Sequence, residues 1–257
     1  MKYSARCRDV SNIKHALIIA HYHREGKIRT DTVDAIKLFC GVFDRVILVS
    51  TNLRDAEKAK VHQDCEVIVR ENVGYDFYSY REGLLKILKE EGQVRVSLLN
   101  SSFVILFPQR LLQNYFQPIS VDLPTPFFGL TKSEEIFPHL QSYLLTFDPA
   151  VWSVPPFLDW WETMTPISER NEVVSKYEIG LSIFMHAQNV EFQPAFNFIR
   201  MGLSSNPSHG GGAQLLELFG LVKVELYSKN PQNVDLNFLK PIVDSDKFSV
   251  LKEGLEN

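Results

Sequence analysis

Short apolar runs alternate with amphipathic segments over the first hundred residues. Four short runs predict strands: Ala16–Ala20, Val46–Val49, Val67–Val69 and Val94–Leu99. The first is continuously apolar, which is typical of a strand buried on both faces. Between them lie segments with apolar residues on one helical face, which predict helices over about 31–43, 56–61 and 77–90. This alternation predicts a mostly parallel sheet with helices on both faces.

The pattern changes after residue 104. Pro108 can begin a short helix, and the aromatic residues between 149 and 164 are expected in the core. The other expected elements are strands 127–130, 143–147 and 190–192 and helices 175–187 and 215–221. We interpret 1–257 as a single domain in which 1–104 and 105–257 form two halves. Residues 1–14 are polar and are expected to be a flexible or pairing arm.

Some polar residues suit helix starts. Thr30 or Asp31 can cap the first helix, and Ser175 with Glu178 has the spacing of a capping box. Gly83 inside the third helix costs about 1 kcal/mol relative to Ala, so close packing against a strand or a ligand would explain it. The triple glycine Gly210–Gly212 precedes a helix but matches no complete phosphate-binding motif, and a flexible turn is the preferred interpretation.

Polar residues gather where the third and fourth expected strands end. Asn72, Gly74 and Asp76 follow one strand, and Asn100 and Ser102 follow the other. In open α/β sheets ligands bind at the carboxyl ends of the strands. A glycine there lets the backbone approach a ligand. A plain turn at Asn72–Gly74 and a helix cap at Asp76 are the alternative interpretations.

Five short blocks, in order, make the chain resemble a known family. They are Asn-Val-Gly-Tyr-Asp-Phe-Tyr-Ser-Tyr from Asn72, Leu-Leu-Asn-Ser-Ser from Leu98, Phe-Phe-Gly-Leu-Thr from Phe127, His-Leu-Gln-Ser-Tyr from His139 and Lys-Tyr-Glu-Ile-Gly-Leu-Ser from Lys176. Asn206–His209 is a further possible block. Together they are similar to the rhamnan synthesis protein F family of bacterial glycosyltransferase-like proteins.

The resemblance implies a fold and a reaction. The fold is α/β and GT-A-like, with a Rossmann-like, mostly parallel nucleotide-sugar-binding half and a mixed acceptor half. The reaction is transfer of a sugar, rhamnose in the first place, from a nucleotide diphosphate such as dTDP-rhamnose to a glycan or lipid-linked glycan, with inversion. The setting is bacterial surface-polysaccharide assembly, in the O-antigen or the cell wall. A non-catalytic nucleotide- or glycan-binding module is the alternative, and a sugar-nucleotide hydrolase a weaker third.

Candidate residues follow from these blocks and from the strand ends. The nucleotide-sugar site is expected to include His21, Thr51, Asn72, Gly74, Asp76, Asn100 and Ser102. Inverting transfer needs a group that takes a proton from the acceptor hydroxyl, and Glu178 is the first candidate and His139 the second. Gln141 and Tyr143 are expected to bind the acceptor. A purely structural capping role is the alternative for Glu178.

The place where related enzymes hold a divalent metal differs here. The family commonly has Asn-Asp-Ser where this chain has Asn100-Ser101-Ser102, so the acid is missing. Neutral amide and hydroxyl groups alone bind Mg²⁺ or Mn²⁺ poorly. Either Asp76 supplies a carboxylate, or a cation from Arg70, Arg81 or His209 takes the electrostatic role of the metal.

Composition and charge indicate which partners and which cellular compartment to expect. The net charge is −4 with no basic block, which gives no sign of a nucleic-acid partner. The three cysteines have no Cys-x-x-Cys spacing and suggest incidental thiols in a reducing compartment. Because no run approaches the about 20 apolar residues of a membrane span, we expect a cytoplasmic protein, with peripheral association at the inner face of the bacterial membrane as one option.

Overall fold

A computed structural model of the chain describes residues 13–203 and 206–256. Its centre is a 7-stranded sheet in the order β10-β6-β9-β4-β1-β2-β3. The strands are β1 (His15–Tyr22), β2 (Arg45–Thr51), β3 (Cys65–Arg70), β4 (Arg95–Asn100), β6 (Phe127–Gly129), β9 (Leu144–Phe147) and β10 (Phe192–Pro194). The four predicted N-terminal strands are therefore confirmed.

The strand directions divide the sheet. Strands β1, β2, β3 and β4 pair in parallel, with Ala16 opposite Arg45 and Val96. Strand β9 runs antiparallel to both β4 and β6, and β10 is parallel to β6. The predicted α/β class with a mostly parallel sheet is confirmed, and the proposed boundary between halves after residue 104 stays a prediction. The sheet takes strands from both sides of that boundary.

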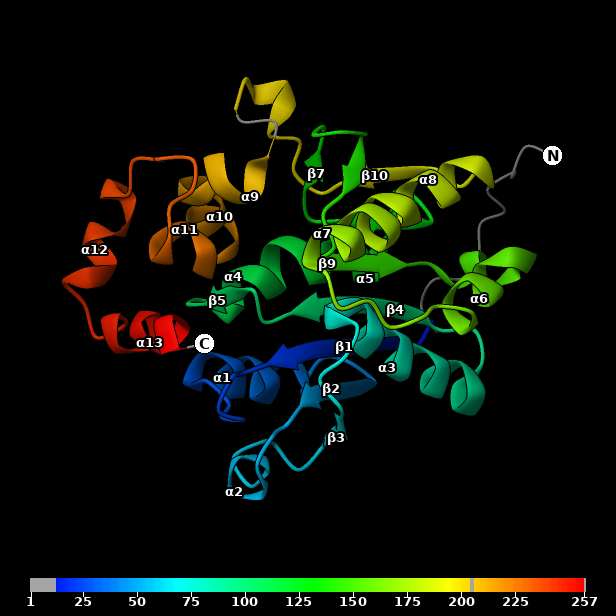
Figure 1. Cartoon of the computed structure of the whole chain (residues 1–257), viewed down its shortest axis with the longest axis horizontal. Coiled ribbons are helices and arrows are strands. Elements are labelled where there is room, and N and C mark those ends of the chain that lie inside the picture. Colours follow the sequence, from blue (N-terminus) through cyan, green and yellow to red (C-terminus); the bar gives the residue numbers. More distant parts are fainter. Residues whose placement is uncertain (1–12, 204–205, 257) are drawn as a thin grey trace.

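Helices cover both faces of the sheet (Figure 1). They are α1 (Thr30–Phe39), α2 (Asp55–Lys58), α3 (Tyr75–Glu91), α4 (Pro108–Leu111), α5 (Gln117–Val121), α6 (Pro155–Glu162), α7 (Arg170–Val173), α8 (Gly180–Ala187), α9 (Pro207–Gly210), α10 (Gly212–Phe219), α11 (Val224–Ser228), α12 (Lys240–Val243) and α13 (Phe248–Glu253). Alternate residues of β1 enter different cores. Ile18 packs with α3 and α6, while Leu17 packs with α1. A strand buried on both faces needs this continuous apolar run.

The aromatic cluster between 149 and 164 belongs to the core, as predicted. Trp161 and Phe157 are fully buried, and Phe77 of α3 stacks on Trp161 with ring centroids 6.2 Å apart. Large aromatic side chains supply much of the apolar area that stabilises a core. This cluster packs against the first turn of α3, where the polar loop that follows β3 ends.

Two small antiparallel pairs lie outside the main sheet. Strand β5 (Phe103–Ile105) pairs with β11 (Leu221–Lys223), and β7 (Lys132–Ser133) pairs with β8 (His139–Leu140). The C-terminal helices return to the N-terminal half, with α13 beside α1 (Figure 1). There the Glu253 carboxylate accepts hydrogen bonds from Thr30 N and Oγ1, at 2.6 and 2.8 Å. The tail therefore closes over the β5–β11 layer.

Several predicted boundaries are wrong. Arg29, rather than Thr30 or Asp31, occupies the cap position of α1, and its guanidinium instead pairs with buried Asp31 at 2.9 Å. The predicted helix 215–221 is α10 at 212–219, since Gly220 has φ +69 and ends it before β11. The predicted strand 190–192 begins at Phe192 instead.

The triple glycine is not a flexible turn. It joins α9 to α10, and a Cβ on Gly211 would lie 2.3 Å from the Phe198 ring. Cys65 is buried and Cys40 half-buried, and neither forms a disulfide in the described residues. Cys7 and residues 1–12 of the expected arm lie outside those residues.

Gly83 shows why close packing selects glycine on α3. A Cβ at this position would lie 2.7 Å from Ile18 Cγ2 of β1. We expect Gly83→Ala to lower the free energy of unfolding by about 1–3 kcal/mol, because overpacking outweighs the gain in helix propensity. Urea denaturation measures the change. The same substitution at Gly180, the first residue of α8, where the nearest atom to a Cβ is Ser175 O at 3.5 Å, is the control for helix propensity without overpacking. A more stable Gly83→Ala protein would contradict the packing explanation.

Candidate functional site

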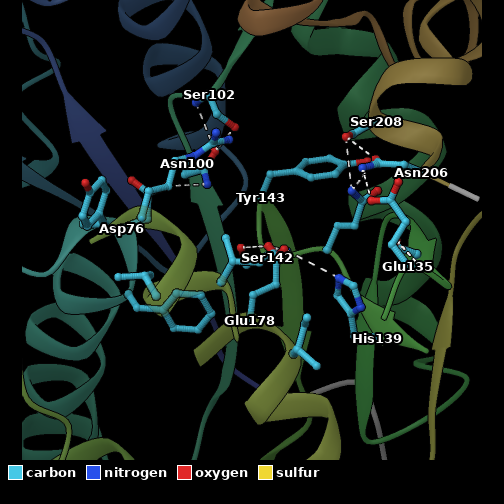
Figure 2. Close-up of a pocket in the computed structure, with 18 of the residues that line it drawn as sticks. Asp76, Asn100, Ser102, Glu135, His139, Ser142, Tyr143, Glu178, Asn206 and Ser208 are labelled. Atoms are coloured by element: carbon cyan, nitrogen blue, oxygen red, sulfur yellow. Dashed lines mark hydrogen bonds and ion pairs between the residues drawn. The ribbon is translucent and has the colours of Figure 1, made fainter. Parts of the chain in front are cut away.

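A pocket of about 310 Å³ lies at the carboxyl end of β4. Helix α3, the β7–β8 hairpin, α7 with the π-helical segment that follows it, the start of α9 and the end of β11 contribute its walls. Eight residues predicted from the sequence line it: Asp76, Asn100, Ser102, His139, Gln141, Tyr143, Glu178 and His209. Figure 2 shows Asp76 and Asn100 on one side, Glu178 near the middle, and Glu135 and Asn206 on the other.

Asn100 ties the two polar loops together. Its amide nitrogen donates to Asp76 Oδ2 at 2.7 Å, and its Oδ1 accepts from Ser102 N at 3.1 Å and Ser102 Oγ at 2.6 Å (Figure 2). Asp76 lies in the first turn of α3, whose cap position is Gly74. The helix-cap interpretation of Asp76 is therefore wrong, because its carboxylate bonds across the pocket wall to β4.

Burial is the main influence on the pKa of the Asp76 carboxyl. It raises the pKa of this carboxyl from 3.8 to about 6, although the positive charges of Lys223 and Arg70 oppose the rise. A carboxylate that is short of solvent and turned toward a pocket can exchange a proton near neutral pH or bind a polar ligand. Nothing in the packing of α3 requires such a group.

Glu178 and His139 form a pair on the opposite wall. Glu178 Oε1 lies 3.6 Å from His139 Nε2, and Glu178 Oε2 accepts hydrogen bonds from Ser142 N, at 2.8 Å, and Ser142 Oγ. His139 Nδ1 in turn lies 2.7 Å from the Phe137 carbonyl oxygen, which fixes the ring (Figure 2). The two residues predicted as candidate bases thus form one ion pair, in which Ser142 holds the carboxylate and the Phe137 carbonyl holds the imidazole.

Glu178 and His139 each stabilise the charged form of the other. Burial opposes ionisation of Glu178, but the bonds from His139 and Ser142 outweigh it and lower the pKa of the carboxyl. Burial likewise opposes protonation of His139, but Glu178 and the Phe137 carbonyl outweigh it and raise the imidazole pKa. Glu178 is therefore ionised at neutral pH and can accept a proton.

The predicted capping box at Ser175 is wrong. The helix begins at Arg170, and Val174–Ile179 forms a π-helical segment between α7 and α8. Ser175 is exposed within this segment, and Glu178 points to Ser142 rather than to a helix end. Single π-helical turns often occur at functional sites because the extra residue redirects a side chain.

Gln141 and Tyr143 line the pocket and also brace it. Gln141 Nε2 donates to Asn206 Oδ1 at 3.0 Å and to Ser208 Oγ at 3.2 Å, while its Oε1 accepts from Thr131 Oγ1 at 2.9 Å. The Tyr143 hydroxyl lies 2.6 Å from the same Thr131 oxygen. These bonds hold the segment before α9 against β8. The acceptor-binding role assigned to both residues stays a prediction.

Four predicted donor-site residues lie elsewhere. His21 and Thr51 are buried at the ends of β1 and β2, and His21 Nδ1 lies 2.7 Å from Ser50 Oγ. Burial lowers the His21 pKa to about 3, so this ring is neutral. Asn72 is exposed, and Gly74 adopts φ +70 at the start of α3, where a Cβ would contact Tyr78 at 2.7 Å. None of the four lines the pocket, and their proposed roles stay predictions.

Lys223, Arg170 and Ser142 also line the pocket, although no sequence pattern indicated them as site residues. Lys223 ends β11, directly opposite Phe103 of β5, and lines the pocket beside Ser102. Ser142 lies within the His139 block, and its bonds to Glu178 make it a functional candidate. No local pattern marks Lys223, because a pairing of strands over a hundred residues apart brings it to the site.

Two of the cations suggested in place of a metal have structural roles. Arg70 donates to Ser79 Oγ and to the carbonyls of Glu71, Val73 and Tyr75, which shapes the loop before α3. Arg81 donates to the Trp161 and Glu162 carbonyls and joins α3 to α6. Neither lines the pocket.

The residues do not fit a divalent-metal centre. Within 13–203 and 206–256 no group of three or more His, Cys, Asp or Glu side chains could hold a metal ion. The Asn100 oxygen already accepts two hydrogen bonds, and Ser101 Oγ accepts from Tyr22 N at 3.1 Å rather than lining the pocket. Both Glu178 oxygens face donors of this chain. Mg²⁺ and Mn²⁺ need free oxygen ligands, which this donor set does not assemble.

The helices were also compared with the length and hydropathy of membrane-spanning segments. Among residues 13–203 and 206–256, none combines the length and the apolar character that crossing a lipid bilayer requires.

Solved structures share parts of this architecture at low identity. A Desulfovibrio desulfuricans G20 protein described as a nucleotide-diphospho-sugar transferase is 10% identical, with a TM-score of 0.46 and 93% of this chain and 94% of that chain covered. Glucosyl-3-phosphoglycerate synthase of Mycobacterium tuberculosis, solved with Mn²⁺, UDP and phosphoglyceric acid, is 12% identical, with a TM-score of 0.45 and coverage of 82% and 80%.

Sequence comparison identifies the family. An uncharacterized protein of Sinorhizobium fredii, y4gN, is 29% identical over 144 residues, which is 53% of this chain and 37% of that protein. The chain thus matches little more than a third of that relative's length. The family described as rhamnan synthesis protein F matches residues 46–250. This match and the mostly parallel sheet agree with the predicted α/β, GT-A-like fold class. The chain belongs to the rhamnan synthesis protein F family.

Proposed function

We propose that this chain transfers a sugar, rhamnose in the first place, from a nucleotide diphosphate donor to a bacterial surface glycan or a lipid-linked glycan. The observation that carries the proposal is the convergence of Asp76, Asn100 and the Glu178–His139 pair on one pocket at the carboxyl end of β4. Ligands bind at that edge of open α/β sheets. The choice of dTDP-rhamnose rests on the family, whose description concerns rhamnan synthesis.

The proposed step is an inverting displacement at the anomeric carbon. Glu178 accepts the proton of the acceptor hydroxyl as that oxygen bonds to the anomeric carbon, and the electrons of the breaking carbon–oxygen bond leave with the nucleotide diphosphate. His139 keeps Glu178 ionised and oriented. Asp76, held by Asn100, hydrogen-bonds donor hydroxyls. A general base contributes about 10²–10⁴-fold to such a transfer.

The donor site can be tested without knowing the acceptor. We expect one of dTDP, UDP, GDP and CDP to raise the melting temperature, with dTDP first, and the shift to persist in EDTA. A nucleotide at 100 times its dissociation constant stabilises a protein by about 2.7 kcal/mol. Differential scanning fluorimetry with Mg²⁺, Mn²⁺ or chelator measures the shift.

The same series separates the rival function. A shift without any sugar transfer to glycan acceptors would favour a non-catalytic binding module, and release of free sugar without acceptor would favour a hydrolase. No shift with any of the four nucleotides would contradict the proposed donor site.

A further inference from the structure

Lys223 lies at the pocket wall, beside the turn Asn100-Ser101-Ser102. Its strand β11 pairs with β5 so that Lys223 is opposite Phe103, and Val224 N donates to the Ser102 carbonyl oxygen at 3.0 Å. These bonds fix the Lys223 backbone beside the turn Asn100-Ser101-Ser102. Its ammonium lies 5.0 Å from the centroid of the Phe103 ring, at the pocket wall.

The ammonium group is half-buried and has no close anionic partner. Within the described residues, Lys223 forms no ion pair at 4.0 Å or less and donates no side-chain hydrogen bond. Burial lowers its pKa, while the more distant charges of Glu178, Glu225 and Asp76 act in the opposite direction. A partly buried cation without a hydrogen-bonded partner is unfavourable in the fold, and a bound anion would supply the missing partner.

Arg170 is the other permanently charged cation that lines the pocket among the described residues, and it already has a partner. It is largely exposed, and its guanidinium lies 3.3 Å from Glu225 Oε2. Burial lowers the pKa of His209, so this imidazole is neutral at neutral pH, although its Nε2 lies 3.6 Å from the same oxygen. The pocket also holds the carboxylates of Asp76, Glu135 and Glu178. A donor diphosphate that enters this acidic pocket therefore needs a cation that is still available, and Lys223 provides it.

We propose that Lys223 binds the diphosphate of the sugar donor and stabilises its negative charge as it leaves, in place of a divalent metal ion. This inference rests on the proposed function. The bond between the anomeric carbon and the phosphate oxygen breaks, both electrons stay on that oxygen, and the Lys223 ammonium donates a hydrogen bond to the diphosphate. A preorganised cation in a site of low dielectric stabilises a leaving anion strongly.

The test measures nucleotide affinity by isothermal titration calorimetry in EDTA. The probe is the nucleoside diphosphate of the set dTDP, UDP, GDP and CDP that binds wild type. We expect Lys223→Met to weaken its binding at least about tenfold, since charged hydrogen bonds contribute on that scale. We expect Lys223→Arg, which keeps the charge, to retain most of the affinity. Exposed Lys229, outside the pocket, is the matched control as Lys229→Met.

A second measurement distinguishes loss of the diphosphate contact from loss of the folded pocket. Saturation-transfer NMR with the corresponding nucleoside, which has no phosphate, should give the same signal for wild type and Lys223→Met. Equal diphosphate affinity in wild type and Lys223→Met would overturn the inference and leave the proposed function intact. So would an equal loss in Lys223→Arg and Lys223→Met, or wild-type binding that needs added Mg²⁺ or Mn²⁺. If wild type binds none of the four nucleotides, the proposed function fails and this inference fails with it.

Discussion

The Glu178→Gln variant is expected to lose about 100-fold or more in turnover while its affinity for the donor nucleotide stays unchanged. The amide keeps the size of the side chain and can still accept a hydrogen bond from Ser142, so the pocket keeps its shape. It cannot accept the proton of the acceptor hydroxyl. A change in kcat without a change in nucleotide dissociation constant is the pattern of a group that acts in the chemical step.

The same variant should change stability in a defined pH range. The lowered pKa of Glu178 stabilises the fold above its ordinary value of 4.5, and this contribution is lost as pH falls through the folded-state pKa. The raised pKa of His139 stabilises the fold below 6.5, and this contribution is lost as pH rises through its folded-state pKa. Glu178→Gln should therefore be most destabilising between about pH 4.5 and 6.5.

Initial rates with dTDP-rhamnose and a glycan acceptor, together with urea denaturation at several pH values, measure both effects. Glu172→Gln is the control, since this exposed glutamate lies on α7, just before the π-helical segment, and does not line the pocket. A turnover close to wild type in Glu178→Gln would refute the assignment of Glu178 as the base, whatever happens to the pH profile.

The Asp76→Asn variant is expected to become more stable and less active. At pH 8 the ionised Asp76 is unfavourable in the fold, because burial raises its pKa from 3.8 to about 6. The folded-state pKa lies above the unfolded one, so the penalty is absent below 3.8, grows as pH rises toward 6 and is constant above it. Asparagine removes the charge and can still accept the hydrogen bond from Asn100. The expected gain above pH 6 is on the order of 1–3 kcal/mol.

Turnover of Asp76→Asn should fall about 100-fold if the carboxylate contacts the donor in the transition state. Gain of stability with loss of activity is typical of a residue kept for function, because the site accepts an unfavourable charge. Thermal melts at pH 4 and pH 8 and initial rates measure the two effects, with exposed Asp34 of α1 as Asp34→Asn for the control. A variant that is active and no more stable at pH 8 would contradict both the burial argument and the donor-site role.

The sequence alone determined the central architecture and much of the site. The short apolar runs predicted strands, and they are β1 to β4 of the parallel sheet, although β3 at the sheet edge is only partly buried. The apolar face of α3, with Phe77, Tyr80, Leu84 and Ile87, is buried as its period predicts. The polar blocks at strand ends also predicted that Asp76 and Asn100 would meet, because parallel strands bring their carboxyl ends to one edge.

Tertiary structure decided the roles of individual side chains. Ser175 and Glu178 have capping-box spacing, yet the helix starts at Arg170 because its packing against α3 and the pocket wall outweighs the local capping signal. Glu178 is instead directed to Ser142 and His139 by a π-helical turn, a feature with no dependable local signature. Lys223 reaches the site only through the pairing of β11 with β5. Local sequence encodes periodicity and propensity, whereas a long-range strand pair depends on which apolar surfaces bury one another, and that is settled only in the folded chain.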